Sequence, residues 1–223
     1  MLIDPLQHLF EQTQLLSYKA NEVIARSDDV PKYIYYIKSG FVRVYSINSR
    51  GEEYLHIIYC TDELFPIVSL NGKVQRGVFY EALEGVKVHR LSSDSLLSVV
   101  QDKAALSFAL TQHILRQFNL YVDRVDNLVY KFGRERLVYR IIFMASRFGK
   151  QTQRGLLIDL PITQKTLGSS INLSRETVAR ELRRLETRGL VAYEDRRILI
   201  LDIIHLCDEL KDPSNPDYWG LKR

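Results

Sequence analysis

Residues 163–189 constrain this chain most strongly, because they predict two short helices joined by a tight turn. Thr163 and Ser174 stand where a hydroxyl group can accept hydrogen bonds from the unpaired amides of a first helical turn. Residues 168–173 between them are rich in small and turn-forming types, as a bend between helices requires. The second helix ends at Gly189 and has one apolar face. That face consists of Val178, Leu182 and Leu185.

The charged residues of the second helix lie largely off its apolar face. They are Arg175, Glu176, Arg180, Arg183 and Arg184. A helix with one buried stripe and an arginine-bearing N-terminal end fits the major groove of DNA. The pattern therefore predicts a DNA-reading helix. The alternative is an ordinary helical hairpin whose arginines form a solvated face.

The segment after this helix favours the DNA-reading interpretation. Residues 190–202 predict two short strands around the charged turn Asp195-Arg196-Arg197. Such a pair of strands is the wing of a winged helix-turn-helix. The two arginines are expected at the tip of the wing, beside the phosphate backbone.

The charge of the chain is unevenly distributed. The chain has 223 residues, 46% of them hydrophobic, which suits two modest domains with cores of their own. Residues 134–223 hold 17 Lys and Arg against 12 Asp and Glu, whereas residues 1–133 hold 14 against 15. A near-neutral N-terminal part and a basic C-terminal part fit a sensor domain joined to a module that binds a polyanion.

Nothing in the sequence predicts export or membrane insertion. The N-terminus lacks a basic stretch followed by an apolar core, and no apolar run approaches the roughly 18 residues of a membrane span. Cys60 and Cys207 are far apart in the sequence, and we expect two reduced thiols rather than a disulfide or a metal site. A cytoplasmic location is expected.

The pattern of the N-terminal part of the chain predicts many short strands separated by turns that contain Gly, Ser and Asn. They are residues 23–25, 33–37, 41–47, 54–59, 78–83 and 86–91. Regular strands of this length indicate an antiparallel barrel or jelly roll. Such a barrel can enclose a small ligand or be filled by its own side chains.

A long helix is expected from about residue 95 to residue 132, with a break near residues 102–103. One stripe repeats at alternating spacings of three and four and predicts a heptad seam. It consists of Phe108, Thr111, Leu115, Phe118, Val122, Val125, Val129 and Phe132. A second stripe consists of Leu106, Leu110, Ile114, Tyr121 and Leu128. We expect one stripe to pack on the barrel and the other to form a parallel dimer, although both could be buried in one chain.

These elements predict an α+β chain with three parts. They are an N-terminal jelly-roll sensor domain over residues 1–100, a dimerisation helix and hinge over 101–133, and a winged helix-turn-helix over 134–223. The hinge is expected at residues 132–134, where Gly133 can absorb a dihedral change. Residues 212–223 are expected to cap the winged domain.

The chain resembles the family of the catabolite activator and the fumarate-nitrate reductase regulator, called Crp/Fnr, over essentially its whole length. The most specific match is residues 174–180, SRETVAR, which resemble the recognition segment S-R-E-T-V-G-R with Ala179 in place of glycine. Residues 36–44 and 125–136 also match. The resemblance implies a bacterial transcription regulator whose partners are double-stranded DNA and a second copy of the chain. RNA polymerase and a small-molecule effector are candidate further partners.

By this resemblance Arg175, Glu176 and Arg180 would contact base edges in a TGTGA-like half-site. Arginine can donate two hydrogen bonds to guanine, and a carboxylate can accept one from cytosine. The alternative for Glu176 is an intrahelical pair with Arg180. Contacts to the DNA backbone are expected from Thr163, Lys165, Ser174, Thr177, Arg183, Arg196 and Arg197.

The resemblance fails where relatives that bind cyclic nucleotides hold the ligand. Phe65-Pro66 stands where the family places glycine and glutamate, although Arg76-Gly77 can occupy the arginine-serine position. On the long helix Tyr121-Val122 replaces the small hydroxyl residues that face the base. Arg76, Gly77 and Tyr121 are the candidate effector-binding residues. We expect an effector other than cyclic AMP, or none, and a cyclic-nucleotide-responsive regulator with a divergent pocket is the alternative.

The sequence offers few ligands for an iron–sulfur cluster, a haem or a catalytic metal. An iron–sulfur cluster would need about four cysteine thiolates, and the chain has two cysteines. The five histidines are scattered and predict no haem or metal site. A barrel metalloenzyme of the cupin type would need clustered histidine and carboxylate ligands, and no H-x-H pattern occurs. We therefore expect no enzymatic activity.

Overall fold

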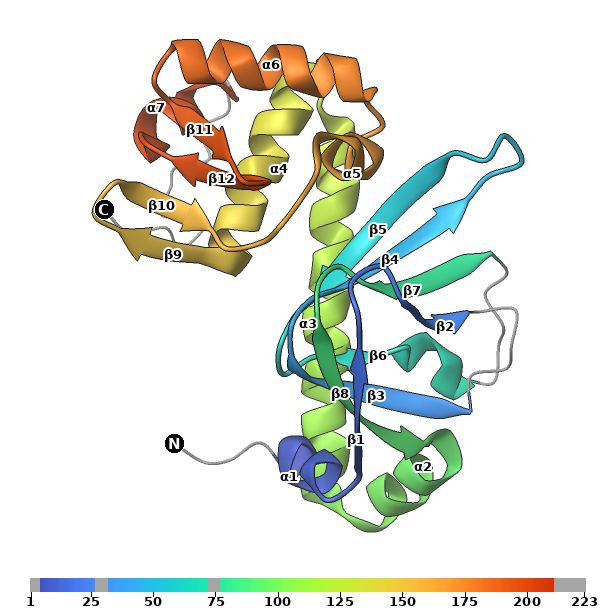
Figure 1. Ribbon diagram of the computed structural model, residues 1–223. Helices are drawn as coiled ribbons and strands as arrows, with labels where there is room; N and C mark the ends of the chain where they lie inside the picture. The colour runs from blue at the N-terminus through green and yellow to red at the C-terminus, as the bar shows by residue number, and fades with distance from the viewer. Residues whose placement is uncertain (1–4, 27–31, 72–76, 211–223) are drawn as a thin grey trace. The chain divides into compact units, whose positions relative to one another are not determined.

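The computed structural model describes residues 5–26, 32–71 and 77–210, which form two compact units (Figure 1). The first unit covers Met1–Val122 and the second covers Asp123–Arg223. Arg76 of the candidate effector site and the expected cap at residues 212–223 lie outside the described residues. None of the helices in the described part combines the length and apolar character that a membrane span requires.

The first unit contains two four-stranded antiparallel sheets, which confirms the expected jelly roll. The first sheet has the order β1, β8, β3, β6, with bounds Gln14–Tyr18, Val86–Ser92, Tyr33–Ser39 and Leu64–Phe65. The second has the order β2, β7, β4, β5, with bounds Val23–Arg26, Val78–Ala82, Val42–Ile47 and Glu53–Tyr59. The sequence patterns missed β1 and β6. A short 3₁₀ helix, Ile67–Asn71, follows β6.

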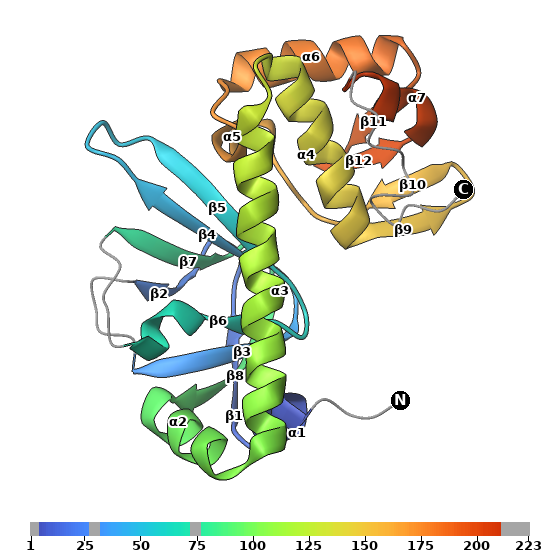
Figure 2. The same cartoon turned by 180° about the vertical axis from the view of Figure 1, so that it is seen from behind.

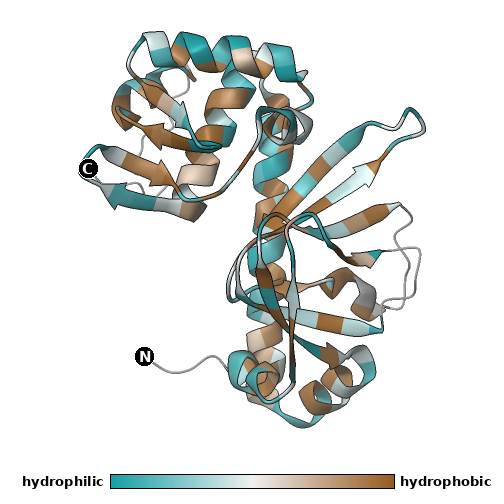
Figure 3. Cartoon of the chain, viewed as in Figure 1, coloured by the Kyte–Doolittle hydropathy of each residue, from teal (hydrophilic) through white to brown (hydrophobic). Residues whose placement is uncertain are grey.

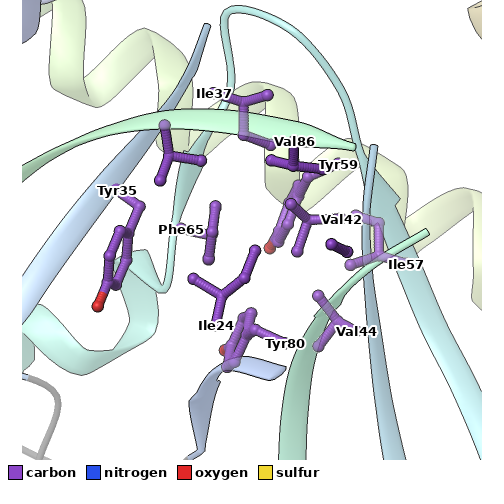
Figure 4. Packing of buried hydrophobic residues seen from close by; sticks show 12 residues of the cluster. Ile24, Tyr35, Ile37, Val42, Val44, Ile57, Tyr59, Phe65, Tyr80 and Val86 are labelled. Carbon is purple, nitrogen blue, oxygen red and sulfur yellow. The ribbon is translucent and has the colours of Figure 1, made fainter. Parts of the chain in front are cut away.

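The space between the two sheets is filled with side chains from both (Figure 4). Phe65 is fully buried at its centre. Its ring stacks on those of Tyr35, Tyr59 and Tyr80, with centroid distances of 5.2, 6.1 and 5.6 Å. Burial raises the pKa of Tyr59 and Tyr80, so both phenols are neutral in this core.

Three helices cover the other face of the first sheet. They are α1 at Pro5–Glu11, α2 at Ser93–Asp102 and the beginning of α3, which covers Ala104–Val129. Leu6 and Phe10 of α1 and Leu96 of α2 are fully buried there. Leu106 and Leu110 of α3 belong to the same cluster. Seen from behind in Figure 2, the N-terminal part of α3 runs along the barrel.

The buried face of α3 differs from the second stripe that the sequence predicted. Leu106 and Leu110 are buried as expected, but Ile114, Tyr121 and Leu128 are exposed. The buried stripe continues instead through His113, Gln117 and Asn127. Gln117 is held because its Nε2 donates to the Leu64 carbonyl at 2.5 Å and its Oε1 accepts from the Tyr59 hydroxyl at 3.4 Å. The break before Ala104 is confirmed, and α3 ends at Val129 rather than at residue 132.

Within its described residues, 123–210, the second unit contains a four-stranded antiparallel sheet, the end of α3 and four further helices. Its strand order is β11, β12, β10, β9, with bounds Val191–Glu194, Arg197–Ile200, Gly155–Ile158 and Gly149–Thr152. The helices are α4 at Gly133–Phe148, α5 at Gln164–Ser170, α6 at Arg175–Thr187 and α7 at Ile203–Asp208. In Figure 3 α6 is largely hydrophilic, with hydrophobic segments between the polar ones. The hairpin of β9 and β10 was not predicted.

Candidate nucleic-acid interface

Both helices of the predicted helix-turn-helix begin at the residues that the sequence indicated. The Thr163 Oγ1 accepts a hydrogen bond from the Thr166 amide at 3.1 Å at the start of α5. The Ser174 Oγ accepts one from the Thr177 amide at 3.2 Å at the start of α6. Each hydroxyl therefore satisfies an amide that has no partner within its helix.

The turn between α5 and α6 is shorter than the sequence predicted. Helix α5 continues to Ser170, so Gly168 lies inside it rather than in the turn. A Cβ at Gly168 would come within 2.5 Å of the Leu173 carbonyl oxygen, so this glycine lets the turn fold back on α5. The chain reverses at Asn172, whose φ of 54° is left-handed.

Helix α6 is held by the three apolar residues that the sequence indicated. Val178, Leu182 and Leu185 are at most 1% exposed. The helix closes where the Leu190 amide donates to the Leu185 carbonyl and Gly189 has a φ of 70°. This anchoring leaves the opposite face of α6 available to a partner.

The three residues expected to contact base edges are all exposed at the N-terminal end of α6. The Arg180 side chain is 68% exposed, and its Nε lies 3.4 Å from Oε1 of the neighbouring Glu181. Within the described part of the chain Glu176 is not ion-paired with Arg180. Hydrogen bonds from the Glu176 amide and the Ser174 hydroxyl, together with the Arg175 charge, hold the pKa of the Glu176 carboxyl below its usual value.

The wing is formed by β11 and β12, as the sequence predicted. Its two turn residues, Asp195 and Arg196, have left-handed φ values of 48° and 61°, which suit a tight hairpin. Arg196 is exposed. Arg197 is not at the tip as expected, because it opens β12 and its Nε donates to Asp159 Oδ1 at 3.2 Å. Lys150 first, and then Arg197, hold the pKa of Asp159 below its usual value.

The remaining candidates for contact with the DNA backbone lie on α5 and α6. Lys165, Ser174 and Arg183 are exposed, whereas Thr163 and Thr177 are half-buried. The hydroxyls of Thr163, Ser174 and Thr177 already take part in the two caps. The structure thus places these candidates within one unit, on or next to α5 and α6 and in the wing.

The end of α3 is tied to this unit by two polar contacts that the sequence did not indicate. Arg124 donates to the Ser170 carbonyl at 3.0 Å, at the end of α5. Asn127 donates to the Arg136 carbonyl at 2.9 Å and is almost fully buried. A Cβ at Gly133 would lie 2.9 Å from the Leu173 side chain. The absence of a side chain at Gly133 therefore has a packing role, beside the hinge role that the sequence suggested.

The predicted dimer seam is exposed along α3 and just beyond it. Seven of its apolar side chains are between 41% and 79% exposed in the single chain. They are Phe108, Leu115, Phe118, Val122, Val125, Val129 and Phe132. Thr111, the polar member of the seam, is also exposed.

Of the candidate effector residues, Gly77 and Tyr121 lie within the part of the chain that the structure describes. Gly77 precedes β7 and has a φ of 72°. Tyr121 is 36% exposed on α3, and its phenol is a hydrogen-bonding neighbour of Tyr59. Phe65, at the position of the family's ribose-binding segment, points into the aromatic core (Figure 4).

Solved structures with a similar fold support this architecture. The structure of FixK2 from Bradyrhizobium japonicum matches with a TM-score of 0.76 and 22% identity, over 87% of this chain and 96% of that chain. The structure of a CooA mutant from Carboxydothermus hydrogenoformans matches with a TM-score of 0.76 and 18% identity, over 91% of this chain and 90% of that chain. These likenesses concern the fold.

The chain is also similar in sequence to characterised regulators. The transcriptional activator protein FnrA of Stutzerimonas stutzeri is 26% identical over 191 residues, which are 85% of this chain and 77% of that protein. A CRP-like cAMP-activated global transcriptional regulator of Mycobacterium tuberculosis is 23% identical over 194 residues, 87% of each chain.

Two family models match separate parts of the chain. Residues 15–103 match the cyclic nucleotide-binding domain, and residues 135–209 match the Crp-like helix-turn-helix domain. The two matches include both barrel sheets except the start of β1, and all of α5, α6 and the wing. The chain belongs to the Crp/Fnr family of DNA-binding transcription regulators.

Proposed function

We propose that this regulator is a homodimer that reads a palindromic DNA site with TGTGA-like half-sites, under the control of an effector other than cyclic AMP or of none. The observation that carries the proposal is the exposed N-terminal end of α6 with Arg175, Glu176 and Arg180. The proposed role is binding rather than catalysis. RNA polymerase is a candidate partner once the protein is on DNA.

The chemistry of these three side chains supports readout of bases. Each guanidinium can donate two parallel hydrogen bonds to O6 and N7 of a guanine, and the Glu176 carboxylate can accept from N4 of a cytosine. Glu176 is exposed and therefore ionised and able to accept at neutral pH, and its lowered pKa extends this state to lower pH. The open position of Arg180 supports the same role.

Contacts to phosphates would fix the register of α6 on the duplex. We assign them to Thr163, Lys165, Ser174, Thr177, Arg183, Arg196 and Arg197. Ser174 can keep accepting from the Thr177 amide while it does so, but its O–H, which donates to Thr177 Oγ1 at 3.2 Å, would have to turn toward the phosphate. Arg197 is the weakest of these candidates, since its guanidinium is already paired with Asp159.

The exposed seam supports a dimer. A stripe of seven exposed apolar side chains is large for the surface of a monomer, and covering it with a second copy would remove it from water. Two parallel α3 helices would present two α6 helices to half-sites one helical turn apart, roughly 34–36 Å.

The aromatic core supports an effector other than cyclic AMP. Phe65 is fully buried among tyrosines and offers no acceptor for a ribose hydroxyl. A ribose hydroxyl buried without a partner costs about 1–3 kcal/mol. The Mycobacterium tuberculosis relative is named for activation by cAMP, so a cyclic-nucleotide-responsive regulator with a divergent pocket is the second candidate.

Selection of bound duplexes from a random pool tests the proposal. We expect a palindrome of TGTGA-like half-sites, with binding that weakens steeply as salt rises because phosphate contacts release counterions, with a slope of about −0.9 per contact. Cyclic AMP added at millimolar concentration should leave the affinity unchanged. Enrichment of no sequence would refute site-specific reading, and a large gain in affinity with cyclic AMP would favour the second candidate.

A further inference from the structure

Tyr193 of β11 is bonded to two other parts of the DNA-reading unit. Its amide donates to Glu186 Oε1, on α6, at 2.9 Å. Its hydroxyl donates to the Ile162 carbonyl, just before α5, at 2.9 Å. The phenol therefore joins a wing strand to the entry of the helix-turn-helix.

Both the backbone carbonyl and the backbone amide of Ile162 form hydrogen bonds with residues of the wing. The Ile162 carbonyl accepts from Tyr193, and the Ile162 amide donates to the Arg196 carbonyl in the wing turn at 2.8 Å. The Ile162 side chain is fully buried. The next residue, Thr163, is the cap of α5. We call Ile162, Tyr193 and the Arg196 carbonyl the wing clamp.

We propose that Tyr193 is a positioning residue whose wing clamp holds the Arg196 turn and the Thr163 cap at a fixed separation, so that both meet the DNA backbone at once. This inference rests on the proposed function, because it concerns two of the phosphate contacts assigned there. In this proposal Tyr193 does not contact DNA itself but positions Arg196 and Thr163, which do.

The physical reason is preorganisation. Arg196 and Thr163 lie 33 positions apart in the sequence and come from separate segments, so their separation depends on contacts between those segments. If the wing turn moved freely, it would lose conformational entropy on binding to two phosphates. That loss would weaken the affinity for DNA. The wing clamp orders the turn before DNA arrives.

Tyr193→Phe removes the hydroxyl and keeps the ring. We expect the full-length variant to bind both a palindromic and a random duplex about three- to tenfold more weakly, because one bond that orders a phosphate contact is lost. The ratio of the two affinities should stay unchanged, since phosphate contacts carry no sequence information. Tyr54→Phe is the control, because it removes a phenol on β5 that donates to Glu52 at 3.1 Å.

A double-mutant cycle separates positioning from a direct contact. In the Arg196→Ala background, Tyr193→Phe should weaken binding by less than twofold, because the contact that it positions is already gone. Equal losses in both backgrounds would overturn the proposal. So would a Tyr193→Phe variant that binds like the parent protein.

Hydrogen exchange of the Ile162 amide tests the wing clamp without DNA. This amide should exchange at least several-fold faster in Tyr193→Phe than in the parent protein, while the Thr177 amide in the α6 cap keeps its rate. Unchanged Ile162 exchange would overturn the proposal. A parent protein that binds neither duplex would instead refute the proposed function, and the exchange result would still decide whether the wing clamp exists.

Discussion

At the scale of single residues, α6 divides its side chains between those that anchor it and those that stay exposed for the proposed recognition of DNA. Val178 and Leu182 are buried, while Arg175 and Arg180 extend into solvent. The Ser174 cap fixes where the helix begins, and so it decides which residues occupy its first two turns. These features depend on chemistry within a few residues, and the sequence therefore predicted them.

Arg180 provides the sharpest residue-scale test of base reading. Arg180→Ala should cost about 1–3 kcal/mol on the selected palindrome and relax preference at one base pair. Arg184→Ala is the matched control, because it removes the same charge from an exposed position on the same helix outside the proposed trio. Competition with duplexes altered at single positions measures both variants. Equal losses for Arg180→Ala on every duplex would contradict its role.

Residues whose partners are distant in the sequence were harder to find. Gln117 and Asn127 are polar, so periodicity alone did not place them on the buried face of α3. Each is buried because its amide donates to a backbone carbonyl, of Leu64 and of Arg136 respectively. Similarly, Phe65 was recognised as a departure from the family, but its stacking partners come from three other strands.

At the scale of elements, strands were predictable where apolar and polar residues alternate and a clear turn follows. The other strands were not. Strand β1 is half-exposed and mixes apolar with polar residues, whereas β6 has two residues. Strand β9 is mostly exposed and polar, so it shows little alternation. All three are defined by pairing with a partner strand, and that information is not local.

Substitution of apolar residues by glutamate tests the proposed dimer seam on α3. Phe118→Glu combined with Val125→Glu should convert the proposed dimer to a monomer, because four glutamates would face one another across the two-fold axis in the proposed apolar seam. Arg116→Glu is the control, since it makes the same change in charge at an exposed position outside the seam. Analytical ultracentrifugation distinguishes the two variants. A double variant that remains a dimer would place the dimer contact elsewhere.

At the scale of the whole molecule, the chain joins a filled barrel to a winged DNA-reading unit. The last turns of α3 belong to the second unit, where Arg124 and Asn127 tie them to α5 and α4. Residues that form the end of the proposed seam are therefore fixed to α5 and α4, which in turn contact α6 of the same chain. In a dimer this arrangement would let the seam determine the spacing of the two α6 helices.

The central claim is that two chains read two half-sites together. It is tested most directly by the mass of the complex in solution, measured by native mass spectrometry on a palindromic duplex and on a duplex with one half-site destroyed. We expect two chains on the palindrome, and binding to the damaged duplex that is weaker by at least tenfold. One chain per palindrome, or equal affinity for both duplexes, would contradict the account.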